Sequence, residues 1–169
     1  IETTNRELRR NVCPSKHLEP ILETYRYCEE LRLRKAMTMI IGLGEDLEDF
    51  ASFRSFVKDH DISRVTFYAL NAHEGTPFAR SPDKEYYASW IREARASFPD
   101  IEIIAGAWSD KAHYYSALLC AGADHITKIP AIRKFASKEL HEIEDEVKKS
   151  GKTFAGTLTQ LPAIDWDVQ

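Results

Sequence analysis

Cysteine is scarce in this sequence: only Cys13, Cys28 and Cys120 occur among 169 residues. They are odd in number and widely separated, so the sequence predicts neither a disulfide framework nor a paired CxxC metal site. Cys28 and Cys120 fall among apolar positions of expected helices, where we expect small buried side chains. Cys13 precedes Pro14 in an expected loop, and no adjacent His or Asp identifies it as a nucleophile.

Long apolar runs and an excess of positive charge are also missing. No stretch approaches the roughly 18 apolar residues of a transmembrane helix, and the first residues do not form a signal-peptide pattern. We therefore predict a cytoplasmic protein without membrane contact. The net charge is −4 and the pI is near 5.9, with Lys and Arg interspersed among acids. This pattern excludes a basic surface for a phosphate backbone, so nucleic acid is not an expected partner.

The composition, 43% hydrophobic and 30% charged, is that of a globular domain with a core. Apolar residues at helical spacing alternate with short β-branched or aromatic runs. Helices are predicted over residues 17–34, 46–57, 83–94, 110–121 and 132–149, and strands over residues 36–41, 64–70, 101–105 and 125–129. Residues 1–150 form the expected domain, and residues 151–169 form a tail without a clear pattern.

The strand and helix alternation predicts an α/β fold with right-handed crossovers and a parallel sheet. A complete (β/α)8 barrel needs about 250 residues. Four βα units and the tip of a preceding strand correspond to the second half of a TIM-type barrel, from the end of strand 4 through strand 8 and the final helix. The sequence starts at Ile1 as if at the end of a strand, so we expect a fragment of a longer protein.

Functional groups of parallel α/β folds collect in loops at the C-terminal ends of the strands. In this sequence those loops are residues 2–17, 42–45, 71–78, 106–109 and 127–130. The segment from Gly42 to Glu45 places small residues where a ligand could approach the backbone, followed by an acid that can accept hydrogen bonds. A tight turn is the alternative interpretation, because the spacing matches neither GxGxxG nor a P-loop.

Taken in order, five segments resemble radical S-adenosylmethionine (SAM) enzymes, in particular the biotin synthase-like group with its hydrogenase-maturation and pyrrolysine-pathway members. The segment Thr38-Met-Ile-Ile-Gly-Leu-Gly-Glu45 is similar to the superfamily motif GxIxGxxE, with Thr38 at the first glycine. The other four segments are Ile1-Glu-Thr3 at the end of strand 4, Gly75-Thr-Pro-Phe78 after strand 6, Ile103-Ile-Ala-Gly106 in strand 7, and Ala121-Gly-Ala-Asp-His-Ile-Thr127 before and in strand 8.

The resemblance implies a SAM site at the strand ends. Glu2 matches an acid that binds the ribose hydroxyls, and Lys16 stands where relatives have an arginine for the SAM carboxylate. Ile40 and Asn71 match two positions beside the adenine, although either could instead belong to the barrel core. The turn residues Gly42 and Glu45 complete the predicted SAM-binding set.

The resemblance also implies a substrate cavity and residues that face it. These substrate-facing residues are His73, Glu74, Trp108, Thr127 and Lys128. Polar surface loops are the alternative interpretation, and Trp108 could be an aromatic residue that packs a lid. No catalytic acid, base or metal ligand is assigned within the chain.

The implied cofactors are SAM and a 4Fe-4S cluster, whose CxxxCxxC ligands would lie outside this chain. With electrons from a flavodoxin or ferredoxin, the cluster would cleave SAM reductively to a 5′-deoxyadenosyl radical that acts on a small-molecule substrate. Biotin synthase itself is excluded, because Ala36 and Ala107 replace a cysteine and an arginine that hold its second cluster.

Two alternatives from other classes remain open. The chain could be a non-catalytic half-barrel that serves as a binding or assembly module without a cluster. It could also belong to an unrelated TIM-barrel aldolase or isomerase, although Lys128-Ile-Pro130 stands where a phosphate-binding glycine loop would follow the last strand. A half-barrel exposes a sheet edge and an apolar face, so a homodimer is a further expectation.

Overall fold

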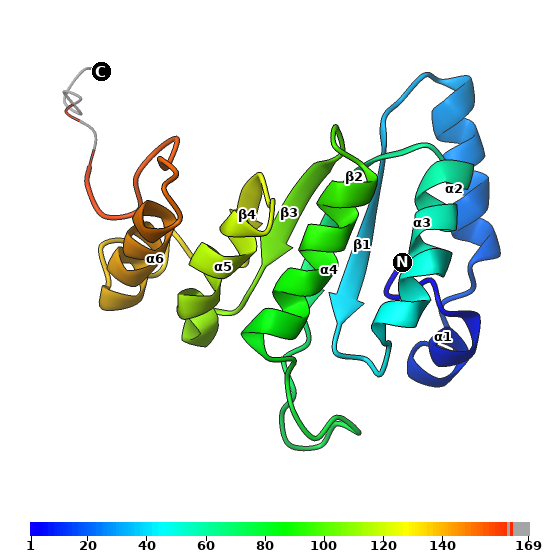
Figure 1. Cartoon of the computed structure of the whole chain (residues 1–169), viewed down its shortest axis with the longest axis horizontal. Helices are drawn as coiled ribbons and strands as arrows, with labels where there is room; N and C mark the ends of the chain where they lie inside the picture. Colours follow the sequence, from blue (N-terminus) through cyan, green and yellow to red (C-terminus); the bar gives the residue numbers. More distant parts are fainter. Residues whose placement is uncertain (162, 164–169) are drawn as a thin grey trace.

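The computed structural model describes residues 1–161 and residue 163, and it shows an α/β fold built on a parallel sheet (Figure 1). The four strands are adjacent in chain order: β1 (Lys35–Ile41), β2 (Ile62–Ala69), β3 (Glu102–Gly106) and β4 (His125–Thr127). Each pair is parallel, with Tyr68 opposite Gly106 and Gly106 opposite Thr127. The predicted α/β class and parallel pairing are confirmed.

Helices connect the strands as the sequence pattern predicted, with shifted boundaries. They are α1 (Arg6–Val12), α2 (Glu19–Glu30), the 3-10 turn η1 (Leu47–Asp49), α3 (Phe50–Asp59), α4 (Lys84–Ser97), the 3-10 turn η2 (Ser109–Tyr114), α5 (Tyr115–Cys120) and α6 (Lys138–Lys149). Asp46 and Asp83 are N-caps, as predicted, because their side chains accept backbone N–H groups of η1 and α4. Gly122 follows α5 with φ +119°, a conformation suited to a residue without Cβ.

Three local predictions were wrong. α1 lies in the segment that we expected to be a loop, because Asn5 caps it by accepting from the N–H groups of Glu7 and Leu8. α6 begins at Lys138 rather than at residue 132, since Ala136 has φ +55° and Ser137 caps the helix. Cys120 is exposed and Cys28 is only half-buried, rather than buried as predicted, although Leu119 and Ala121 beside Cys120 are buried.

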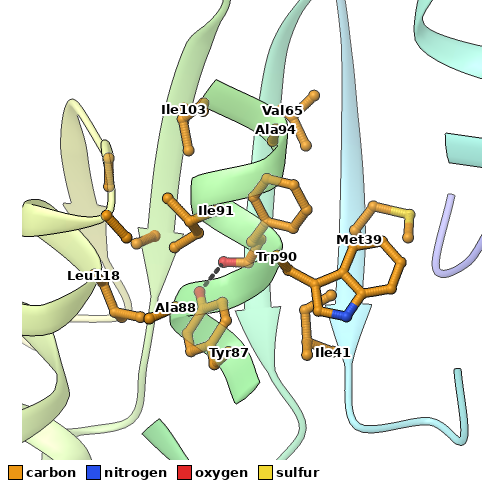
Figure 2. Close-up of a cluster of buried hydrophobic side chains, with 14 of the residues drawn as sticks. Met39, Ile41, Val65, Tyr87, Ala88, Trp90, Ile91, Ala94, Ile103 and Leu118 are labelled. Carbon is orange, nitrogen blue, oxygen red and sulfur yellow. Dashed lines mark hydrogen bonds between the residues drawn. The ribbon is translucent and has the colours of Figure 1, made fainter. Parts of the chain in front are cut away.

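One face of the sheet is buried beneath the helices. Every second residue of β1, from Met37 to Ile41, is at most 3% exposed, and Val65 and Phe67 of β2 are fully buried. Figure 2 shows Tyr87, Trp90 and Ile91 of α4 over this face, among side chains of the strands. This period of two confirms the buried strands and places the core between sheet and helices.

The opposite face carries the alternate strand residues, which are only partly buried. Ile40, Thr66, Tyr68, Ile104 and Thr127 belong to this set. In a closed barrel such residues would face the interior. The structure describes an open sheet of four strands and not a closed barrel.

Two tyrosines fix the C-terminal ends of the strands to one another. The hydroxyl of Tyr87 donates to the carbonyl of Phe67 at 2.7 Å, the hydrogen bond drawn as a dashed line in Figure 2. The same hydroxyl accepts from the N–H of Gly106 at 3.0 Å. The hydroxyl of Tyr115 lies 2.8 Å from the carbonyl of Ala107 and 2.7 Å from that of Thr127. Both rings are fully buried, and burial raises the pKa of each hydroxyl. Helices α4 and α5 thereby hold β2, β3 and β4 together where polar side chains emerge.

The predicted division into a domain and a tail is only partly described. Residues 151–161 follow α6 without helix or strand, and Glu144 accepts hydrogen bonds from the N–H of Leu158 and the hydroxyls of Thr157 and Thr159. Pro162 and residues 164–169 lie outside the described residues. No helix in the described part of the chain is long and apolar enough to cross a membrane.

Candidate functional site

The carboxylate of Glu2 is the centre of the first polar group at the C-terminal edge of the sheet. The backbone carbonyl of Glu2 accepts from the N–H of Ile40 at 2.8 Å, which fixes residue 2 beside the end of β1. Its carboxylate accepts from Lys16 Nζ at 2.6 Å and from Arg9 Nη1 at 2.9 Å. Partial burial alone would raise the pKa of Glu2, but the hydrogen bonds from Lys16 and Arg9 outweigh it and lower the pKa to about 2. Glu2 is therefore ionised at neutral pH.

Arg9 organises this group, although the sequence pattern did not single it out. It is 7% exposed, and its second nitrogen, Nη2, donates to the backbone carbonyl of Lys16 at 2.8 Å. One guanidinium thus holds both the Glu2 carboxylate and the backbone of the residue that contacts it. The sequence signal for Arg9 would have been a predicted helix over residues 6–12, because Arg9 is the buried residue of that helix.

Lys16 contacts the other carboxylate oxygen of Glu2 from the solvent side. Its side chain is 65% exposed, and the hydrogen bond to Glu2 raises its pKa. The Sγ atom of Cys13 lies 3.9 Å from Glu2 Oε2, and burial raises the pKa of this thiol. We call Glu2, Arg9, Cys13 and Lys16 the Glu2 group; within it, one carboxylate offsets two cations.

A cavity of about 480 Å³ lies next to the Glu2 group, between α1 and the start of α2. Arg9, Cys13 and Lys16 line it. Lys16 is the one predicted SAM-binding residue on its wall, because Glu2, Ile40, Gly42, Glu45 and Asn71 do not line it. The structure therefore brings Glu2 and Lys16 into contact and places Ile40 beside Glu2. It does not enclose all predicted SAM-binding residues in one cavity.

Glu45 shapes the turn that follows β1. Glu45 is 7% exposed. Its carboxylate accepts from the N–H of Gly42 at 2.6 Å and from the N–H of Leu43 at 2.8 Å. Burial raises the pKa of Glu45 despite these backbone donors. Gly42 has φ +106°, and a Cβ there would collide with Pro82. Glu45 thus contacts its own turn, which agrees with the tight-turn interpretation of this motif.

The loop after β2 separates its predicted residues. Asn71, at the start of the loop, has its Oδ1 atom 3.4 Å from Lys111 Nζ. His73 and Glu74 are exposed, and the carbonyl of His73 accepts the hydroxyl of Thr76 in a local turn. Figure 1 shows this loop projecting beyond the strand ends. Within the described residues, no hydrogen bond or ion pair joins the His73 and Glu74 side chains to the other predicted site residues.

The ends of β2, β3 and β4 form a second polar group. The Nζ atom of Lys128 lies 4.8 Å from the ring centroid of Tyr68 and 5.1 Å from that of Trp108. Gly106 makes room for the Tyr68 ring, because a Cβ at residue 106 would overlap that ring and crowd the Thr127 methyl group. We call Tyr68, Trp108, Thr127 and Lys128 the Lys128 group. The structure therefore brings together three of the predicted substrate-facing residues and adds Tyr68, which the sequence analysis missed.

Comparison with known proteins identifies one relative and no family. No family model matches the chain. An uncharacterized protein of Methanocaldococcus jannaschii is 36% identical over 166 residues, which are 97% of this chain and 46% of that protein. The chain thus spans about half the length of the curated relative it matches. The activity, substrates and partners of the whole protein are therefore matters of proposal.

Proposed function

We propose that this chain is the C-terminal half of the barrel of a radical SAM enzyme and supplies part of its SAM site and substrate cavity. The observation that supports the proposal is the common location of the matched residues. Glu2, Ile40, the Gly42–Glu45 turn and Lys128 all lie at the C-terminal edge of one parallel sheet, where ligand sites of such folds occur.

The chemistry of the Glu2 group fits SAM. An ionised carboxylate can accept hydrogen bonds from both ribose hydroxyls, and the low pKa of Glu2 keeps it ionised. The exposed Lys16 ammonium can leave Glu2 and pair with the SAM carboxylate. SAM binding would thus replace the Lys16–Glu2 ion pair, while the buried Arg9 keeps the Glu2 side chain in place.

The remaining SAM contacts follow from the backbone. Ile40 presents an apolar, partly buried side chain on the sheet face opposite the core, next to residue 2. Glu45 acts indirectly in this proposal, as a positioning residue that holds the N–H groups of Gly42 and Leu43 and fixes the turn beyond Ile40. These residues would bind and orient the adenosine.

In this proposal, the ligands of the iron-sulfur cluster lie outside the chain. Cys13, Cys28 and Cys120 lie on separate elements, and the described residues contain no group of three or more His, Cys, Asp or Glu side chains that could hold a metal ion. In this proposal, reductive cleavage of SAM is the chemistry of a cluster bound by another part of the protein. We assign the described residues to binding and orientation only.

The proposal is tested by SAM binding to the chain, measured by calorimetry. We expect Glu2→Gln to weaken SAM binding by about tenfold, the effect of losing a charged acceptor. Glu48→Gln is the matched control, because Glu48 is exposed on η1 and its side chain forms no hydrogen bond or ion pair with the Glu2 group. Equal affinity of the wild-type chain and Glu2→Gln, with both variants folded by circular dichroism, would contradict the Glu2 assignment. The longer protein, reconstituted anaerobically with iron and sulfide, should cleave SAM under reduction.

A non-catalytic binding module is the second candidate, and one observation favours it. Both oxygen atoms of Glu2 already accept hydrogen bonds from cations of the chain itself. If Lys16 and Arg9 remain paired with Glu2 in the presence of SAM, neither the chain nor the longer protein will bind or cleave SAM.

A further inference from the structure

Lys128 is held in an unusual environment for a lysine at a strand end. Its ammonium lies over two aromatic rings, those of Tyr68 and Trp108, which come from the ends of β2 and β3. Ring faces attract cations, so they fix the position of the ammonium, but they carry no net charge to neutralise it. Lys128 forms no ion pair within residues 1–161 and 163, where ten such pairs occur.

The backbone contributes to this arrangement. Lys128 has φ +72°, a left-handed conformation that is unfavourable for a residue with a Cβ. Strained residues of this kind persist where the surrounding structure imposes them, and they are frequent at ligand sites. Here the hydroxyl of Tyr115 holds the carbonyl of Thr127, directly before the strained residue.

Lys111, which follows Trp108 on η2, differs from Lys128 in its charge balance. Lys111 Nζ lies 3.2 Å from the carboxylate of Asp110 and 3.4 Å from Asn71 Oδ1. The charge of Lys111 is therefore offset by an adjacent carboxylate, whereas no carboxylate of the described residues pairs with Lys128. The residue is exposed, and Trp108 beside it is 42% exposed, so a ligand can reach the ammonium.

We propose that Lys128 binds a carboxylate group of the substrate, with the rings of Tyr68 and Trp108 flanking the ion pair. This inference rests on the proposed function, because it assigns the Lys128 group to the substrate cavity. A single ammonium matches the one negative charge of a carboxylate. A phosphate dianion requires more donors, such as a bidentate guanidinium or several backbone N–H groups.

Binding of butyrate, the neutral analogue butyramide and inorganic phosphate to the chain tests the proposal. The readouts are the indole N–H resonance of Trp108 and the methylene resonances of Lys128 in NMR spectra, both assigned through substitutions. We expect butyrate to shift both signals saturably and to bind at least about tenfold more tightly than butyramide. Lys128→Met should abolish the saturable shift of Trp108, and Lys128→Arg should restore it. Lys148→Met, which removes an exposed lysine of α6, should leave it unchanged.

Three outcomes would overturn the proposal: no saturable shift with butyrate, equal affinity for butyrate and butyramide, or unchanged butyrate binding in folded Lys128→Met. Tighter binding of phosphate than of butyrate would overturn the carboxylate assignment. None of these measurements uses SAM, so failure of this proposal is distinguishable from loss of SAM binding at the Glu2 group.

Discussion

The Glu2 group and the Lys128 group lie at the same edge of the sheet but differ in how their charges are balanced. In the Glu2 group, one carboxylate faces two cations, and the guanidinium of Arg9 is buried. In the Lys128 group, one ammonium faces two aromatic rings without a carboxylate. The first arrangement stabilises a loop through internal ion pairs, and the second leaves a cation available for a ligand. This difference motivates our placing SAM and substrate at opposite ends of the edge.

The largest effect is expected from breaking the Lys128 group at Gly106. In Gly106→Ala, the new Cβ would overlap the Tyr68 ring, so the ring must leave its present position beside Lys128. We expect a loss of about 3 kcal/mol in unfolding free energy, typical of severe overpacking, and a changed Trp108 environment. Urea unfolding measures the first effect, and NMR measures the second. Gly156→Ala is the control, because nothing lies within 4 Å of a Cβ there. Equal stabilities of the two variants would refute the described packing of Tyr68.

A smaller effect should follow from removal of Arg9 in the Glu2 group. Arg9→Met leaves Glu2 with only the exposed Lys16 and deprives the Lys16 carbonyl of its donor. We expect a loss of about 2 kcal/mol, less than the cost of breaking a fully buried ion pair, because Glu2 is only partly buried and keeps Lys16. Lys16→Met should cost at most about 0.5 kcal/mol, because that side chain is exposed. If denaturant unfolding gave the reverse order, the central position of Arg9 would be wrong.

Glu45→Gln tests the turn next to the Glu2 group. The amide would replace one carboxylate oxygen by a donor, leaving the N–H of Gly42 or Leu43 without its acceptor. We expect a loss of about 1.5 kcal/mol in thermal or urea unfolding, the cost of one unsatisfied buried group. The exposed Glu48→Gln should change stability by less than about 0.5 kcal/mol. If Glu45→Gln left the unfolding free energy unchanged, the turn would not depend on the carboxylate.

The smallest change in unfolding free energy is expected from acid, which protonates Glu2. The folded-state pKa of Glu2 is about 2, below its ordinary value of 4.5. The stability from ionised Glu2 is therefore complete above pH 4.5 and is lost as the pH falls toward 2. Because solvent screens the exposed Lys16 pair, we expect a contribution of about 1 kcal/mol or less. The difference in unfolding free energy between wild type and Glu2→Gln should shrink over this pH range. A difference independent of pH would show that ionisation of Glu2 does not matter.

Much of the fold could be predicted from the sequence because its signals are local. The caps at Asp46 and Asp83 and the short apolar, β-branched or aromatic runs of the strands depend on neighbouring residues, and the structure confirms both the caps and the strands. The prediction failed at α1, where a short polar helix lacks an apolar period and depends on its Asn5 cap. It also failed at Cys120, because apolar neighbours in the sequence did not show which side of α5 faces the solvent.

The candidate site was predictable only in part. The sequence pattern placed Trp108, Thr127 and Lys128 in loops at strand ends, but it could not pair them or include Tyr68. Parallel register decides that pairing: it sets Tyr68 opposite Gly106, and Gly106 opposite Thr127, across three strands. Arg9 was missed for a similar reason, since its importance lies in two contacts that only the folded loop creates.

The sequence by itself thus determined the α/β class, the order of strands and helices, and the loops that carry polar residues, because periodicity and capping act over a few residues. Only the tertiary structure decided which charges are neutralised. Glu2 meets Arg9 and Lys16 through the folding of one loop, whereas Lys128 meets two rings from distant strands. Charge balance depends on distances across the sheet, and those distances follow from register and packing.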